Sequence, residues 1–265
     1  MVPELRPRGI GEILDAAVAL YRTRFGQLIR YSAIVIVPVQ VFLTLVELSA
    51  QPDRFSLSIT GNPTPQFDSG RAQLAAFVVV LGVGMLTHAF VAAVTTRIVD
   101  DEYVGFSEPA AQAARTGYSR FFAVLAVGIL AGIAQIAGLA FCFVGSFAVQ
   151  AFFAVAVPIV ILERQRVFAA MGRSIELTKS HFWHVLGVVL AASLLSTFLN
   201  AGLTAALNFW AAHGGSTTST VLAQGIVNTI AALITTPFVA AAIVTLYIDL
   251  RIRDEAFDVQ MAIAR

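Results

Sequence analysis

The sequence predicts an all-α integral membrane protein with six transmembrane helices. Of its 265 residues, 58% are hydrophobic and 12% are charged, and the mean hydropathy is +0.81. An ordinary soluble domain is about 25% charged, because polar side chains must cover its core. This composition therefore requires lipid to cover much of the surface. The basic residues also alternate between connecting segments, which a buried core of a soluble protein would not explain.

Six apolar stretches have the length that a transmembrane helix needs. A hydrocarbon layer about 30 Å thick takes about 20 helical residues. Residues 121–162 contain no charged residue and no histidine. Because a single helix over this run would be about twice too long, we predict a hairpin that turns at Gly145 and Ser146. The whole chain, 1–265, is then one polytopic domain with spans over 31–50, 72–98, 121–144, 147–162, 185–210 and 222–248.

The distribution of basic residues orients these spans. All 17 lysines and arginines except Arg54 and Arg71 fall in the N-terminal segment, the second and fourth connections, or the C-terminal tail. Cytoplasmic segments of membrane proteins carry such an excess. We therefore expect both termini in the cytoplasm, and segments 51–71 and 211–221 on the outside of the cytoplasmic membrane.

Short amphipathic helices are predicted on the cytoplasmic side before the first, third and fifth spans. They cover residues 13–25, 110–121 and 168–183. Each ends in basic and aromatic residues, and in the first helix the apolar residues recur on one face at helical spacing. We expect each to be an interfacial helix that lies under the lipid headgroups before the chain turns into the membrane.

Basic residues near these helices are candidate contacts to anionic lipid headgroups, where each contributes about 1 kcal/mol. The candidates are Arg22, Arg24, Arg30, Arg164, Arg166, Arg173 and Lys179. Ordinary positive-inside anchoring explains most of them as well. Three acids, Asp15, Glu176 and Asp249, stand beside these arginines. We expect some of the acids to form ion pairs that hold the interfacial helices in place.

Polar side chains also recur inside the predicted spans. On the fifth span they follow steps of three and four residues, which places them on one helix face, and the sixth span has a sparser series. The candidate intramembrane polar site comprises Gln40, His88, Gln135, Gln150, Ser193, Ser196, Asn200, Thr204, Asn208, Gln224 and Asn228. Two interpretations stay open. The side chains bond across helices, at about 0.6 kcal/mol each, or they line a polar cavity.

Signatures of catalysis are absent from the sequence. It contains no P-loop, no Gly-x-Ser-x-Gly elbow and no His-Glu-x-x-His helix. His181 and His184 stand one helical turn apart, but a zinc site takes at least three protein ligands, so a histidine and aromatic collar at the interface is favoured. The net charge of +1 provides no basic field for nucleic acid. We therefore expect no enzyme activity, no cofactor and no bound metal.

Three charged segments border the predicted spans. They read RGIGEILDAAVALYR at 8–22, MGRSIELTKSHFWHVLG at 171–187 and LYIDLRIRDEAFD at 246–258. Together they resemble the membrane domain fused to some bacterial glycerophosphoryl diester phosphodiesterases, although Ala256 stands where glycine is expected. The resemblance covers nearly the whole chain and implies a helical domain in the bacterial inner membrane. The phosphodiesterase itself is a separate barrel with an early His-Arg and a Pro-Glu-Asn, and neither pattern is present here.

The leading functional interpretation is a non-catalytic integral membrane module. It would bind or organise lipids, or a partner protein of the membrane or cell envelope, and the basic interfacial helices favour it. The alternative is a transporter, or a transporter subunit, that moves a small solute or lipid through a polar groove between the fifth and sixth spans. The polar stripe of the fifth span favours that alternative, and the sequence does not decide between them.

Overall fold

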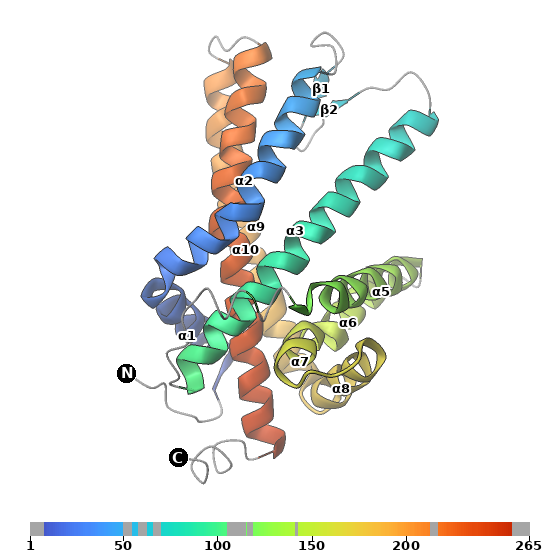
Figure 1. Cartoon of the computed structure of the whole chain (residues 1–265), viewed down its shortest axis with the longest axis vertical. Helices are drawn as coiled ribbons and strands as arrows, with labels where there is room; N and C mark the ends of the chain where they lie inside the picture. Colours follow the sequence, from blue (N-terminus) through green and yellow to red (C-terminus); the bar gives the residue numbers. More distant parts are fainter. Residues whose placement is uncertain are drawn as a thin grey trace.

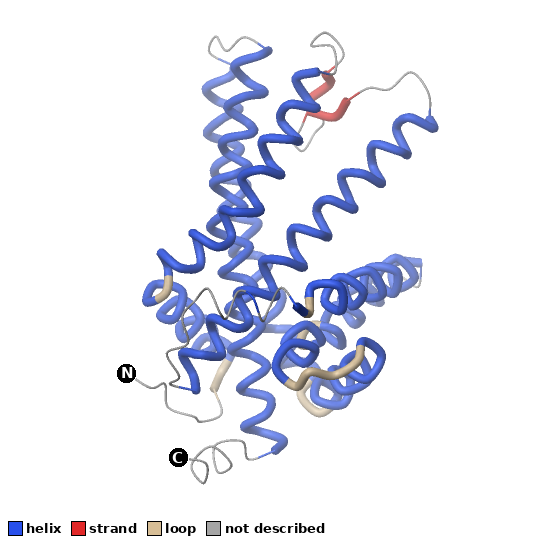
Figure 2. Tube along the Cα trace, viewed as in Figure 1, coloured by secondary structure: helices blue, strands red, loops and turns tan. Residues whose placement is uncertain are grey.

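The described chain is almost entirely helical (Figures 1 and 2). The computed structural model describes residues 8–49, 55–57, 63–65, 70–104, 115, 119–140, 143–212 and 217–255. One short antiparallel hairpin, in which β1 (Phe55–Leu57) pairs with β2 (Pro63–Pro65), lies in the predicted outer segment 51–71. Apart from this hairpin, the prediction of an all-α membrane fold is confirmed.

Within the described residues, six helices are long and apolar enough to cross a membrane, which confirms the predicted number. These spans lie on α2 (Phe25–Ser49), α3 (Gly70–Val104), α5 (Phe121–Ala140), α6 (Phe143–Phe153) with α7 (Ala156–Leu162), α9 (Phe182–Ala212) and α10 (Thr217–Glu255). Several helices are longer than predicted, because they continue from the apolar run into charged residues. The 39 residues of α10 rise about 58 Å, well beyond a hydrocarbon layer of about 30 Å.

The spanning helices diverge from one end of the molecule (Figure 1). This end, here called the base, contains the C-terminal end of α10. α9 packs on α10 as an antiparallel neighbour, α2 packs on α10 from another side, and α3 crosses obliquely. α5 and α6 form a second pair that points away from α9 and α10. The core, which includes Ile13, Leu177 and Tyr247, lies near the base, where α10 also contacts α1 (Ile10–Thr23) and α8 (Val167–Lys179).

The amphipathic helices predicted before the first and fifth spans are present as α1 and α8, whereas the one at 110–121 falls largely outside the described residues. The structure adds that α1 docks on the protein, because its apolar residues, among them Ile13 and Leu20, are buried against α9 and α10. Its expected position at the level of the headgroups stays a prediction. Gly187 of α9 lies against the start of α1, since a Cβ atom there would lie 2.6 Å from Ile10 Cδ1.

The turn between the third and fourth spans does not lie at Gly145 and Ser146, because both residues are inside α6. Gly145 instead serves close helix packing. A Cβ atom on Gly145 would lie 2.5 Å from the carbonyl oxygen of Gly138 on α5, and backbones approach this closely only at small residues. α5 ends at Ala140, and α6 begins at Phe143. The third span is therefore shorter than predicted, and the fourth begins earlier.

A break between α6 and α7 interrupts the fourth span, and α8 covers it. Pro158 in α7 has no N–H to donate to the carbonyl of Ala154 one turn earlier. Nearby, the carbonyl of Phe152 accepts a hydrogen bond of 2.7 Å from the hydroxyl of Ser174, a fully buried residue of α8. A side chain of α8 therefore supplies a hydrogen bond at the break, where the regular helical pattern ends.

Replacing Gly145 with alanine is expected to lower the melting temperature of the detergent-purified protein. The added methyl group would overlap the backbone at Gly138, and overpacking of this kind costs about 1–3 kcal/mol. Gly128 on α5 is the matched control, because a Cβ atom there meets nothing within 4 Å. Circular dichroism followed during heating compares the two variants. Equal melting temperatures for the wild type and Gly145→Ala would contradict the close helix contact.

Candidate functional site

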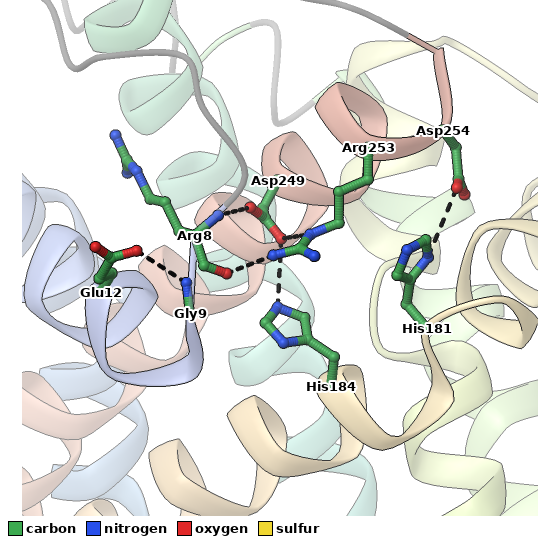
Figure 3. A network of polar contacts seen from close by, with 8 residues as sticks. All are labelled: Arg8, Gly9, Glu12, His181, His184, Asp249, Arg253 and Asp254. Carbon is green, nitrogen blue, oxygen red and sulfur yellow. Dashed lines mark hydrogen bonds and ion pairs between the residues drawn. The ribbon is translucent and has the colours of Figure 1, made fainter.

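A polar network joins the chain before α1 to α9 and α10 at the base (Figure 3). Asp249 of α10 is 2% exposed, and it accepts hydrogen bonds of 2.7 Å from the Arg8 backbone N–H and from Arg253 Nε. Arg253 also donates to the Arg8 carbonyl, so α10 binds both polar backbone groups of one residue. His184 of α9 brings Nε2 to 3.3 Å from the same carboxylate. A buried carboxylate needs hydrogen-bond donors, and the Arg8 N–H and Arg253 supply them here.

The other end of α1 is attached to α10 as well. The hydroxyl of Tyr21 donates to the carbonyl of Ile234 at 3.1 Å, in the turn before Pro237, where proline disturbs the helical hydrogen bonds. Burial raises the pKa of Tyr21 to about 12, so the hydroxyl keeps its proton at physiological pH. Between Ile234 and Asp249 a helix rises about 22 Å. α1 has a similar length and therefore runs alongside α10.

The opposite face of α10 holds the turn between α7 and α8. Tyr247 donates its hydroxyl to Glu163 Oε1 at 2.8 Å, and Gln165 Nε2 donates to the other carboxylate oxygen, also at 2.8 Å. The guanidinium of Arg251 lies 5.8 Å from the centre of the Tyr247 ring. Residues two apart in a helix point about 200° away from each other. Tyr247 and Asp249 therefore serve opposite sides of the same helix.

The three acids expected to hold the interfacial helices behave differently from one another. Asp249 does anchor α1, but its charged partner is Arg253 of its own helix. Glu176 pairs with Arg173 within α8, at 3.7 Å. Asp15 is exposed and forms no ion pair with another described residue. Hydrogen bonds between side chains of α10 and the backbone of Arg8 thus anchor α1, more than ion pairs between helices do.

The candidate headgroup contacts fall into two groups in the structure. The first group lies around α1: Arg22 is on α1, Arg30 is on α2, and Arg24 stands between the two helices. The second group lies around α8, with Arg173 and Lys179 on the helix and Arg164 and Arg166 in the turn before it. Two of them have partners within the chain: Arg24 donates to Gln27 at 3.3 Å, and Arg173 lies 3.9 Å from Glu163. The other five are exposed.

The two histidines at the start of α9 contact different acids. His184 lies beside Asp249, whereas His181 Nδ1 is 3.6 Å from Asp254 Oδ1 (Figure 3). Both contacts link α9 to the last turns of α10. The described residues contain no group of three or more His, Cys, Asp or Glu side chains that could hold a metal ion.

The polar stripe of the fifth span lies on α9, and its side chains bond to α9 itself. Ser196 donates to the Ala192 carbonyl at 3.0 Å, and Thr197 donates to the Ser193 carbonyl at 2.9 Å. Asn200 donates to the Ser196 carbonyl at 2.8 Å, and its side chain is exposed. Serine, threonine and asparagine can all bond in this way to the carbonyl one turn earlier. These three side chains therefore donate within α9 and not to a partner helix.

Two pairs among the other predicted polar residues come together. Gln224 donates to Asn228 at 2.8 Å along α10. Gln150 of α6 and Ser193 of α9 line a cavity of about 80 Å³ between α6, α9 and α10. The remaining candidates are half-buried or exposed on their own helices: Gln40 on α2, His88 on α3, Gln135 on α5, and Thr204 and Asn208 on α9.

An apolar groove of about 360 Å³ lies between α2 and α10, in the half of the bundle away from the base. It is lined by Val37, Val41, Thr44, Leu45, Leu222, Gly225, Ile226, Thr229 and Ile230. The hydroxyl of Thr44 donates to the Gln40 carbonyl and that of Thr229 to the Gly225 carbonyl, so both threonines are satisfied within their own helices. Gly225 touches Thr44, because a Cβ atom on this glycine would overlap that side chain.

Neither the groove nor the binding of Glu163 is predicted from the sequence. Apolar residues at helical spacing are common to every span, so nothing in the pattern marks a groove. The last span does contain a sequence pattern that indicates the polar contacts at the base. Tyr247 with Arg251, and Asp249 with Arg253, are paired at one-turn spacing on two opposite faces.

No protein-family model, curated protein or solved structure matches the chain. The resemblance of its three charged segments to a membrane domain of phosphodiesterases therefore stays a prediction.

Replacing Asp249 with asparagine is expected to lower the melting temperature strongly. The substitution keeps the shape of the side chain but leaves Arg253 and His184 without their carboxylate, and breaking a buried pair costs about 3 kcal/mol or more. Asp254→Asn is the matched control, since Asp254 is more exposed and lies 3.6 Å from His181. Thermal unfolding in detergent measures both variants. Equal melting temperatures for Asp249→Asn and the control would contradict the proposal that this network anchors α1.

Replacing Asn200 with leucine is expected to leave the melting temperature unchanged or to raise it. Its amide is exposed and bonds within α9, so no other helix loses a partner. Asn228→Leu is the contrasting variant, because it removes the acceptor of the buried Gln224 amide and costs about 1–3 kcal/mol. Heating curves of the two purified variants are compared. A marked loss of stability in Asn200→Leu would restore the interpretation of Asn200 as a bond between helices.

Proposed function

We propose that the chain is a non-catalytic integral membrane module that binds lipid, and that the groove between α2 and α10 receives an acyl chain. The observation that carries the proposal is the groove. Its volume of about 360 Å³ lies within the range of ligand pockets, and its threonine hydroxyls are already bonded. Because α2 and α10 are both apolar enough to span a membrane, the groove faces hydrocarbon. An acyl chain matches it in polarity and is present at that depth.

The proposal includes an orientation and a location. Exposed Arg22, Arg30, Arg164 and Arg166 lie on the segments around α1 and α8, and the positive-inside rule assigns such segments to the cytoplasm. The groove then opens at the level of the outer leaflet. The resemblance of the charged segments to the membrane domain of glycerophosphoryl diester phosphodiesterases supports placing the chain in a bacterial inner membrane, without hydrolase activity.

The transport alternative has less support from the geometry. It needs a polar groove between α9 and α10, yet the side chains of Ser196 and Asn200 bond to carbonyls of α9, and Gln224 bonds to Asn228 within α10. The cavity lined by Gln150 and Ser193 measures about 80 Å³, below the roughly 300 Å³ at which ligand pockets begin. Lipid binding is therefore the function that we propose.

Filling the groove is expected to remove the lipid that it holds. Val41 lines the groove and is 52% exposed, so tryptophan at this position occupies the groove without entering the core. Leu195→Trp on α9 is the matched control, because Leu195 is 51% exposed and does not line the groove. Native mass spectrometry of protein purified in mild detergent counts the phospholipids retained. Val41→Trp should retain fewer than the control at an equal melting temperature, and equal retention would overturn the proposal.

A further inference from the structure

The two faces of α8 differ in character. Its inner face, which includes Ala170, Ser174 and Leu177, is buried where α8 packs against α6 and α7. Its outer face carries Phe168 and Ile175, which helical spacing places on one side. These two side chains are 78% and 39% exposed. A helix that is docked to the protein on one side thus shows an apolar stripe on the other.

Trp183 lies in the first turn of α9, after the short turn at residues 180–181 that follows α8, and its side chain is 79% exposed. Tryptophan concentrates at the boundary between hydrocarbon and headgroups, because its ring is apolar and its N–H is polar. The second of the chain's two tryptophans, Trp210, lies near the other end of α9. The two rings therefore mark opposite ends of one span.

Three exposed cations border the stripe, namely Arg164, Arg166 and Lys179. None of the three forms an ion pair with another described residue. The acid on the same side, Glu176, lies 3.7 Å from the guanidinium of Arg173. The stripe is therefore bordered by more positive than negative charge.

α1 provides a comparison within the same molecule. Its apolar face is buried, and its outer face is polar, with Glu12, Asp15 and Arg22 exposed. Water covers such a face readily. The outer face of α8 instead requires an apolar medium beside its cations. That combination occurs at the boundary between acyl chains and anionic headgroups.

We infer that the outer face of α8 with Arg164, Arg166 and Trp183, here called the α8 face, binds anionic phospholipids. The stripe enters the edge of the hydrocarbon, and the cations contact the lipid phosphates. The inference rests on the membrane placement in the proposed function. It concerns a separate surface, however, and it adds selection by headgroup charge. Each cation at such a surface favours an anionic lipid by about fivefold.

Quenching of tryptophan fluorescence by brominated lipids tests this inference. The variant Trp210→Phe leaves Trp183 as the only tryptophan. The full chain is reconstituted into bilayers of phosphatidylcholine and phosphatidylglycerol, with bromine on the acyl chains of one lipid or the other. At equal mole fraction, brominated phosphatidylglycerol should quench Trp183 several-fold more effectively. In the reciprocal variant Trp183→Phe, the signal of Trp210 should show no such preference.

Removing the cations should remove the preference. The triple substitution Arg164→Gln, Arg166→Gln and Lys179→Gln changes exposed side chains that form no ion pair with another described residue, so the fold should be retained. Arg22→Gln with Arg30→Gln is the matched control, since it removes exposed cations beside α1 and should leave the signal at Trp183 unchanged. Salt provides a test that needs no charge variant. At about 1 M the screening length falls to about 3 Å, and the preference should weaken.

Equal quenching by the two lipids would overturn the inference, and so would a preference that survives the triple substitution. Absence of quenching by both lipids would also overturn it, because Trp183 would then face water or a protein partner. None of these outcomes concerns the groove, which Val41→Trp tests through the number of lipids retained. If Val41→Trp retains as many lipids as its control but Trp183 still prefers the anionic lipid, the groove proposal fails and the inference for the α8 face holds.

Discussion

The packing of the base depends on the last turns of α10, because side chains on two opposite faces of this helix bind other segments of the chain. On one side Asp249 and Arg253 bind the backbone of Arg8, just before α1. On the other, Tyr247 binds Glu163 at the turn between α7 and α8. Segments from the beginning and the middle of the chain thus meet at its end. A carboxylate as buried as that of Asp249 remains stable because donors occupy both of its oxygens.

Fixing the bundle at its base has a consequence for the rest of the molecule. Away from the base the helices diverge (Figure 1), and large apolar side chains such as Phe198 and Ile226 are exposed. In water this exposure would be costly, but lipid tails are as apolar as these side chains, so helices in a membrane gain little from covering them. Divergence and lipid contact are therefore compatible. The groove between α2 and α10 is one place where the two helices leave space for such contact.

The parts of this fold that depend on local chemistry could be predicted from the sequence, and those that depend on distant partners could not. Six spans follow from hydropathy, since runs of about 20 apolar residues have few other stable environments. The sequence predicts a turn at Gly145 because glycine favours both turns and close contacts, and only Gly138 on the neighbouring helix distinguishes the two. Asn200 bonds within its own helix, which periodicity cannot separate from a bond between helices. The partner of Glu163 lies far along the chain, at Tyr247.

The same limit applies to the two amphipathic helices α1 and α8. Both have an apolar face at helical spacing, and spacing alone does not say what covers it. α1 turns large apolar residues such as Ile13 and Leu20 towards the protein, where they are buried. α8 turns a face of smaller and hydroxyl-bearing residues towards the protein, where Ser174 bonds at the break between α6 and α7, and leaves Phe168 and Ile175 outside. A face is covered by protein where its side chains find matching space and partners. Large apolar side chains without such a match, set beside cations that form no ion pair with another described residue, therefore favour the lipid contact that we infer for α8.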